Sequence, residues 1–459
     1  MLDIILRQIN SLETQLRYPR VQKYFQEIYL EERSSPEAWR KFNLKRLRAI
    51  LIHAGKNVPY YARLFQERGF DPEKAELPTE LNRIPVLTKK QLHENGRELL
   101  DPNIPPKWRV ENATGGSTGQ PVVFWQGSDY REIASAIENN LLTWWWEINP
   151  YGKKAAVWGA DREFHEQSFR EKLYSWRRQI RTLNAFRMDQ SDLLAFCKML
   201  VQWKPPYLIG YASALYRFAC FAEQNGFDSL RFHALRSSAE MLYPEYREKI
   251  EQVFRSPLYN FYGSREINNL AAECKNHEGL HLLSTWRYVE MTDADGNAVA
   301  PGTPGYVTVT DCGNRIMPFI RYQNGDIGVL SATPCSCGRP NPVLKEILGR
   351  SVDMIIAQDG TMVHGEYFTH LFYGRDDIKA FQIHQTAIDR IVVRYVPLAE
   401  SAHAFVESEW FREKIEKMLG PSVTLEFQPC DMIPIPPSGK HRYTISEVKR
   451  EKELPVELH

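Results

Sequence analysis

Cysteine is scarce in this sequence, with seven residues in a chain of 459. An odd number of cysteines in a long chain does not match the paired framework of a small secreted domain. Long apolar runs are also missing: no stretch reaches 18 consecutive apolar residues, so no transmembrane helix is predicted. The N-terminus lacks the layout of a signal peptide. We therefore expect a cytoplasmic protein without a membrane span.

A large net charge is absent as well. The 58 lysines and arginines nearly balance the 57 aspartates and glutamates, which leaves a formal charge of +1. Without a global basic field, the sequence gives no support for a nucleic-acid partner, and any anionic ligand must be held by a local site. The composition, 43% hydrophobic and 25% charged, is that of a globular protein. It does not define an oligomeric state.

The chain is too long for one ordinary compact core, so two or three folding units are expected. The first hundred residues have the spacing of amphipathic helices, and Ser128 is expected to cap a helix that runs to the core tryptophans Trp144–Trp146. Beyond residue 200, short apolar segments alternate with helical ones, which predicts an α/β core. Residues 286–331 have the texture of strands and turns, a β-rich subdomain. We predict a large unit over residues 1–348 and a small α+β unit over 349–459.

The first motif that carries chemistry is the loop Thr114-Gly115-Gly116-Ser117-Thr118-Gly119. Its glycines let backbone N–H groups approach an anion closely, and its hydroxyls add donors to phosphate oxygens. It is not a Walker loop, because no Lys-Ser/Thr pair follows its last glycine. A plain flexible turn explains the same composition, so the loop alone predicts a phosphate site only weakly.

Two further motifs place carboxylates after apolar strands. In Phe261-Tyr262-Gly263-Ser264-Arg265-Glu266, the glutamate can hold Mg²⁺ beside a triphosphate and Tyr262 can stack on a purine. In Arg321-Tyr322-Gln323-Asn324-Gly325-Asp326, the aspartate can accept hydrogen bonds from ribose hydroxyls. Each motif has a simpler reading. Glu266 can be a surface residue at a strand end, and Asn324-Gly325 is a strong signal for a hairpin turn.

The last two motifs carry cations. Arg350, in Leu348-Gly349-Arg350, can reach a phosphate or a ribose. Lys440 ends the tight turn Pro436-Pro437-Ser438-Gly439-Lys440, where it is a positioned point charge. Such a charge can neutralise both a carboxylate and an α-phosphate.

The order and spacing of these motifs resemble the adenylate-forming ligase superfamily, and within it the phenylacetate–CoA ligase and CapK-like capsule-biosynthesis branch. The resemblance runs from about Lys41 to about Glu447. It is most specific at residues 113–121, 237–274, 317–326 and 435–442. It implies a large N-terminal AMP-binding domain with a β-rich subdomain, followed by a small mobile domain that carries the catalytic lysine.

The resemblance also implies a role for each motif. The loop over residues 114–119 would bind the phosphates of ATP, Glu266 would bind Mg²⁺, and Asp326 would bind the ribose hydroxyls. Arg350 would contact the nucleotide near a hinge, and Lys440 would stabilise the charge of the adenylation transition state. The residues that would line the rest of the nucleotide are Ser238, Ala239, Glu240, Tyr262, Gly263 and Ser264.

A separate group of cysteines and histidines predicts a structural zinc site. Three thiols and one imidazole, Cys274, His281, Cys335 and Cys337, make a four-ligand set, with His277 as the competitor of His281. Free buried thiols with a surface histidine are the simpler alternative, and a redox pair is a weaker one.

We therefore predict an enzyme that activates a small carboxylic acid with ATP and transfers the acyl group to CoA. Two alternatives stay open. In the first, the same adenylate passes its acyl group to an amine or hydroxyl acceptor; in the second, the chain is a nucleotide-binding scaffold without catalysis. The identity of the acid cannot be inferred from the sequence.

Overall fold

The computed structural model describes residues 2–113, 123–159, 169–185, 188–350, 377–434 and 443–448, with short pieces at 355–359, 362–363, 367–368, 371–372 and 375. The predicted phosphate loop over residues 114–119 and Lys440 lie outside these residues, and the backbone alone is described for Arg350. No helix among the described residues is both long and apolar enough to span a bilayer.

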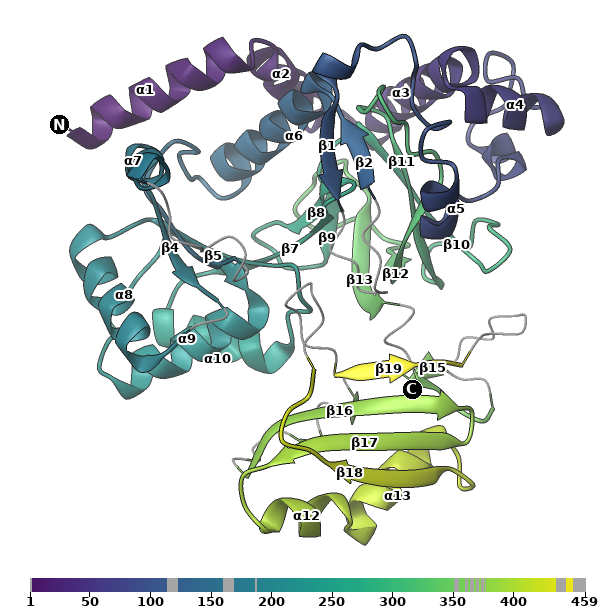
Figure 1. Cartoon of the computed structure of the whole chain (residues 1–459). Coiled ribbons are helices and arrows are strands. Elements are labelled where there is room, and N and C mark those ends of the chain that lie inside the picture. Colours follow the sequence, from purple (N-terminus) through teal and green to yellow (C-terminus); the bar gives the residue numbers. More distant parts are fainter. Residues whose placement is uncertain are drawn as a thin grey trace.

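An eleven-stranded sheet forms the centre of the large unit, in the order β10-β11-β12-β13-β9-β8-β7-β6-β5-β3-β4 (Figure 1). Strands β4, β3, β5, β6 and β7 are parallel, and the rest of the sheet is antiparallel. The strands are β3 (Lys154–Trp158), β4 (Ile180–Asn184), β5 (Tyr207–Tyr211), β6 (Ala234–Ser238), β7 (Leu258–Ser264), β8 (Asn268–Glu273), β9 (Leu280–Leu282), β10 (Arg287–Thr292), β11 (Pro304–Asp311), β12 (Tyr322–Leu330) and β13 (Val343–Arg350).

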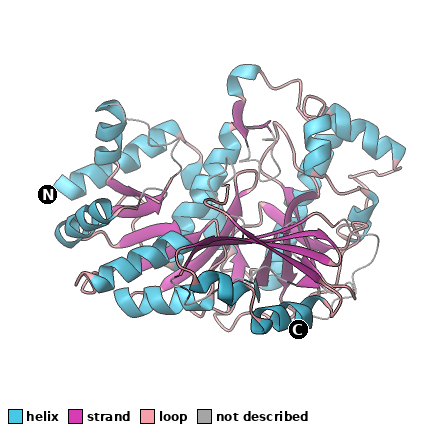
Figure 2. Cartoon of the chain, turned by 60° about the horizontal axis from the view of Figure 1, so that its bottom comes forward, coloured by secondary structure: helices cyan, strands magenta, loops and turns pink. Residues whose placement is uncertain are grey.

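Helices cover both faces of the parallel half, as expected for βαβ units. On one face, α8 (Gln190–Trp203), α9 (Ala212–Gln224) and α10 (Pro244–Phe254) pack on alternate residues such as Leu208 and Leu235. On the other, α6 (Ser128–Asn140) and α2 (Val21–Glu31) cover Tyr207 and Phe261. The two layers are visible in Figure 2.

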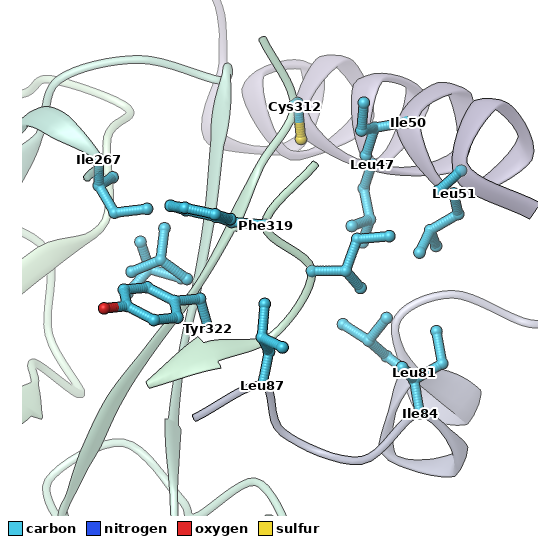
Figure 3. Close-up of a cluster of buried hydrophobic side chains, with 14 of the residues drawn as sticks. Leu47, Ile50, Leu51, Leu81, Ile84, Leu87, Ile267, Cys312, Phe319 and Tyr322 are labelled. Atoms are coloured by element: carbon cyan, nitrogen blue, oxygen red, sulfur yellow. The ribbon is translucent and has the colours of Figure 1, made fainter. Parts of the chain in front are cut away.

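The antiparallel half is covered by the N-terminal helices. These are α3 (Pro36–Asn57), α4 (Pro59–Glu67), the short helix η1 (Thr79–Arg83) and α5 (Lys89–Glu94). Their apolar residues form one cluster with β12 and its neighbours, in which Leu47, Leu51 and Phe319 meet (Figure 3). Tyr322 lies at the edge of this cluster, and its hydroxyl points away from the apolar side chains.

The C-terminal part forms a separate four-stranded sheet in the order β18-β17-β16-β19. Its strands are β16 (Ile378–Ala387), β17 (Arg390–Pro397), β18 (Thr424–Pro429) and β19 (Thr444–Ser446), and it is covered by α12 (Ser401–Val406) and α13 (Glu409–Leu419). Its apolar cluster consists of residues from 355 onward, and Figure 1 shows this sheet beyond the ends of β12 and β13.

Some local predictions need correction. Ser128 is the first residue of α6 and not its cap, because Gly127 occupies the cap position without a side-chain hydrogen bond. Beyond Asn140 the helix continues as a π-helix over Leu141–Trp145. Trp145 and Trp146 are core residues at 1% exposure, whereas Trp144 is 43% exposed.

The hairpin reading of Asn324-Gly325 is wrong, because β12 runs without interruption through both residues. The register shifts between Tyr306 and Thr308, which face Ile327 and Gln323, so the partner strand has fewer residues over this stretch than β12. The Asn-Gly pair therefore forms a β-bulge in which Gly325 adopts a φ of +93°. A bulge changes the direction of neighbouring side chains, and here the neighbour is Asp326.

Candidate functional site

The predicted nucleotide residues gather at one edge of the sheet. Parallel strands β5, β6 and β7 end at Tyr211, Ser238 and Ser264, and neighbouring strands are in register. In open α/β sheets, the carboxyl ends of parallel strands are the usual place for a ligand. The structure thus places motifs that are far apart in sequence at a single edge.

The end of β6 carries Ser238, Ala239 and Glu240. Ser238 is buried, and Ala239 has a φ of +68°, which is uncommon for a residue with a side chain. The carboxylate of Glu240 accepts a hydrogen bond from the Ser213 N–H at 2.9 Å, at the start of α9. Glu240 therefore ties the strand end to the neighbouring helix N-terminus, where a negative charge is favoured.

Tyr262, Asn324 and Asp326 form a compact hydrogen-bonded group. Tyr262 Oη donates to Asp326 Oδ2 at 2.6 Å and accepts from Asn324 Nδ2 at 2.6 Å. Asn324 Nδ2 also donates to Asp326 Oδ2 at 2.9 Å, and the Asp326 N–H donates back to Asn324 Oδ1 at 3.0 Å. The Asp326 carboxylate is thus held in one orientation beside the ring of Tyr262.

Gly263 lies at a position that leaves no room for a side chain. A Cβ there would be 2.4 Å from the carbonyl oxygen of Asn268, which belongs to the backbone of β8. The glycine lets the strand after Tyr262 pass close to β8, and the Ser264 hydroxyl then accepts from the Ile267 N–H at 3.2 Å. This close approach sets the positions of Tyr262 and Glu266 on either side.

Gly263→Ala is accordingly expected to lower both stability and activity. The backbone of β8 must shift to admit the methyl group, at a cost of about 1–3 kcal/mol. Thermal unfolding and an adenylation assay measure the two effects. Gly96→Ala is the matched control, since its Cβ meets only an ordinary contact of 3.4 Å. Equal behaviour of the two variants would contradict this account of Gly263.

Glu266 is buried, with 5% of its surface exposed, and is held from two sides. Tyr322 Oη donates to Glu266 Oε1 at 3.0 Å. The backbone carbonyl of Glu266 accepts from Tyr130 Oη at 3.2 Å and from Gln126 Nε2 at 3.3 Å. The reading of Glu266 as a solvent-exposed residue at a strand end is therefore wrong.

The strands that flank the predicted phosphate loop in sequence contact Arg265 and Glu266. Strands β1 (Val110–Ala113) and β2 (Val123–Gln126) pair antiparallel and flank the loop in sequence. Arg265 Nη1 reaches the carbonyl of Ala113 at 3.4 Å, and Gln126 donates to the carbonyl of Glu266.

The two predicted cations are described only in part. The backbone of Arg350 pairs with Asp326 across β12 and β13, so both residues lie at the same level of the sheet. Gly349, at the predicted domain boundary, is still within β13. Lys440 lies outside the described residues. The chain resumes at Tyr443, before β19, which pairs in parallel with β16.

Sequence reasoning missed Tyr322 and Asn324, which hold the two carboxylates, and Gln126, which binds the backbone carbonyl of Glu266. The available signal for Tyr322 and Asn324 was their place in the motif that ends at Asp326, since the bulge at Gly325 breaks the regular alternation of strand side chains. Arg321, by contrast, is 1% exposed and pairs with Glu290 at 2.9 Å, so it anchors β12 inside the protein.

The four predicted metal ligands lie together at the other end of β8 from Glu266. The ligand atoms of Cys274, His281, Cys335 and Cys337 all fall within 4.8 Å of one another. The sulfurs of Cys274 and Cys335 are 3.7 Å apart, and Cys337 Sγ is 3.4 Å from His281 Nε2. Sulfurs bound to one tetrahedral zinc at about 2.3 Å are about 3.8 Å apart, so this spacing fits a zinc set and not a disulfide.

The surroundings of the cluster suit metal ligands. His281 Nδ1 faces the backbone carbonyl of Asn341 at 3.4 Å, which leaves Nε2 directed at the thiols. Burial lowers the pKa of His281 to about 4, so its ring is neutral at pH 7. The competitor His277 lies elsewhere. Its ring stacks on Tyr259 and its Nδ1 is 2.9 Å from the Glu273 carboxylate.

The buried thiols are held in the protonated state unless a cation is present. Burial raises the pKa of Cys335 to about 12. A divalent cation bound to the sulfurs of Cys274 and Cys335 would reverse this preference. The set therefore fits zinc, and four protein ligands would leave no open position for catalysis.

Comparisons of sequence and of structure relate this chain to known proteins. The CapK C-terminal domain family matches residues 355–447. Protein CapK of Staphylococcus aureus is 24% identical over 93% of this chain and 94% of its own. A phenylacetate–coenzyme A ligase of Thermus thermophilus is 24% identical over 70% of this chain and 72% of its own.

Among solved structures, 2-hydroxyisobutyryl-CoA ligase in the postadenylation state matches with a TM-score of 0.68 at 22% identity. The match covers 94% of this chain and 92% of that one. The predicted architecture, an α/β adenylate-forming ligase fold with a small C-terminal domain, is confirmed. The chain is thus similar over most of its length to CapK and to a phenylacetate–CoA ligase, and it has the fold of the adenylate-forming ligases.

Proposed function

We propose that this protein is an AMP-forming acyl–CoA ligase. In the first half-reaction, a carboxylate oxygen of the acid attacks the α-phosphorus of ATP, and pyrophosphate leaves with the electron pair of the broken P–O bond. In the second, the thiol sulfur of CoA attacks the acyl carbon and AMP leaves. The observation that carries the proposal is the meeting of Glu266, Tyr262 and Asp326 at one sheet edge.

We place the proposed nucleotide site at that edge of the sheet. Asp326, fixed by Tyr262 and Asn324, would accept hydrogen bonds from the ribose hydroxyls. Glu266 would bind Mg²⁺, since hard cations prefer carboxylate oxygens, and the neighbouring loop over residues 114–119 would hold the phosphates. The end of β6, with Ser238, Ala239 and Glu240, would line the adenine.

The remaining predicted residues complete the proposal. Arg350, opposite Asp326 in the sheet, would contact the nucleotide at the junction of the large unit and the small one. Lys440 would be carried by the small unit over residues 349–459, which we propose to rotate between the half-reactions. Zinc at Cys274, His281, Cys335 and Cys337 would be structural.

CoA is the proposed acceptor because phenylacetate–CoA ligases are similar to this chain in sequence, and a 2-hydroxyisobutyryl-CoA ligase is similar to it in fold. An amine or hydroxyl acceptor is the second candidate, favoured by the similarity to CapK over nearly the whole chain. Both candidates share the adenylation step and differ only in the nucleophile that displaces AMP.

Mass spectrometry distinguishes the acceptors. The protein is incubated with ATP, Mg²⁺ and a panel of aryl, fatty and hydroxy acids, with and without CoA. A CoA thioester together with AMP is the expected product. Acyl-AMP that accumulates without a thioester, and is consumed when an amine or a sugar is added, would favour the second acceptor. No AMP with any acid would contradict the proposed ligase.

Tyr322→Phe tests the proposed role of Glu266. The variant removes the hydrogen bond at 3.0 Å that holds one carboxylate oxygen, while the ring remains to fill the core. Loss of a hydrogen bond to a buried charged group costs about 1.5–3 kcal/mol, which corresponds to roughly a tenfold to hundredfold loss in kcat/KM for Mg-ATP. A titration of Mg²⁺ in the adenylation assay measures it.

Tyr61→Phe is the matched control for this prediction. Tyr61 is equally buried, at 1% exposure, and donates to the carbonyl of Pro318 at 2.9 Å, away from Glu266. It is expected to lose stability without a change in Mg²⁺ dependence. If both variants show the same kinetics, Tyr322 has only a structural role.

A further inference from the structure

The first helix carries an exposed apolar stripe that the proposed function does not use. Helix α1 (Leu2–Arg17) presents Ile5, Ile9, Leu12 and Leu16 at 45%, 42%, 59% and 85% exposure. Their spacing of four, three and four residues is the alternation of d and a positions in a heptad repeat. Nothing in the part of the chain that the structure describes covers this stripe.

A different face of α1 already holds the helix on the protein. Leu6, Asn10 and Thr14 are buried, and Asn10 Nδ2 donates to the carbonyl of Arg177 at 3.1 Å. Glu13 pairs with Arg177 at 2.6 Å, and Asp3 pairs with Lys153 at 2.8 Å. These contacts fix the helix on the protein, so the exposed stripe is separate from the face by which α1 packs.

We propose that this stripe is a self-association surface, which pairs with the same stripe on a second copy of the chain. In an antiparallel pair around a two-fold axis, Ile5 meets Leu16 of the second copy, and Ile9 meets Leu12. Each residue then faces one of the other heptad type, so the same stripe complements itself.

The charges around the stripe agree with a protein partner better than with a lipid surface. Gln8 and Gln15 border one side of the stripe, and both are neutral and exposed. Along the helix, Asp3 and Glu13 balance Arg7 and Arg17. Helices that lie on anionic membranes carry a strongly basic polar face, and α1 has none.

The area of the stripe sets the expected strength of the association. A standard protein interface buries about 1,600 Å² in total, and the eight stripe side chains of two copies account for roughly half of it. We therefore expect a reversible dimer in the micromolar range.

Sedimentation velocity over a concentration series tests the proposal on the full chain. The wild type is expected to shift from monomer to dimer, and Leu12→Glu to weaken the dimer at least tenfold, because it places a charge in the apolar seam. Ile4→Glu is the matched control. Ile4 is 60% exposed on the same helix but lies about a third of a turn away from the stripe, so its dimer should persist.

Adenylation activity is followed in parallel. Figure 1 shows α1 at the margin of the large unit, away from the ends of β12 and β13, so all three proteins should keep the same activity in dilute solution. A wild type that stays monomeric at every concentration overturns the proposal. So does a Leu12→Glu variant that dimerises like wild type, or a monomeric wild type that binds vesicles of phosphatidylcholine and phosphatidylglycerol.

Discussion

Lys440→Ala is expected to reduce acyl-adenylate formation by two to three decades and to leave the fold intact. As the adenylate forms, negative charge builds up between the carboxylate and the α-phosphate, and the proposed role of Lys440 is to neutralise it. Removal of one such transition-state contact costs about 2.7–4 kcal/mol. Isotope exchange between pyrophosphate and ATP measures the rate, and circular dichroism checks the fold.

Lys417→Ala is the control for this prediction. Lys417 is an exposed lysine on α13 in the same C-terminal sheet unit, so its loss removes an equal charge from the same part of the chain. It should exchange pyrophosphate at the wild-type rate. A Lys440→Ala variant as active as Lys417→Ala would remove the lysine from the mechanism, although the rest of the nucleotide site would stand.

The second large effect concerns the metal. Protein purified without added zinc is expected to contain one equivalent, and its removal by a chelator should lower the melting temperature by at least about 5 °C. The reason is the position of the ligands: Cys274 follows β8, His281 lies in β9, and Cys335 and Cys337 precede β13. One ion would therefore join three neighbouring strands at one end.

Cys335→Ser separates this effect from general damage. It should lose the metal and the thermal stability while pyrophosphate exchange by the folded protein changes little. Cys430→Ser is the matched control, since Cys430 is a partly exposed free cysteine outside the cluster. Wild-type protein without stoichiometric zinc would contradict the assignment and return the three thiols to the role of ordinary core residues.

Much of the fold could be predicted because the signals were local. The strands near Tyr207 and Leu258 end where glycine and polar residues begin, and the helix after Ser408 is capped by that serine, as the Ser408 Oγ contact with the Phe411 N–H shows. The four cysteine and histidine ligands were recognisable because soft donors that recur at short spacing have few structural uses.

The parts that failed depend on tertiary contacts. Asn324-Gly325 has the composition of a hairpin turn, and only the pairing of β12 with β11 on one side and β13 on the other makes it a bulge. The burial of Glu266 and its bond to Tyr322 join residues 56 positions apart, which no local pattern encodes. The helix of residues 2–17 was predictable, but the exposure of one of its apolar faces was not, because that depends on what packs against it.

Pyrophosphate exchange across aryl, fatty and hydroxy acids is the most direct test of the central claim. The account predicts that at least one acid drives the return of labelled pyrophosphate into ATP, that Mg²⁺ is required, and that exchange proceeds without CoA. Acid-dependent exchange that falls in the Tyr322→Phe variant, but not in Tyr61→Phe, would also support the site at Glu266. The absence of exchange with every acid, in protein shown to be folded, would contradict the assignment as an adenylate-forming enzyme.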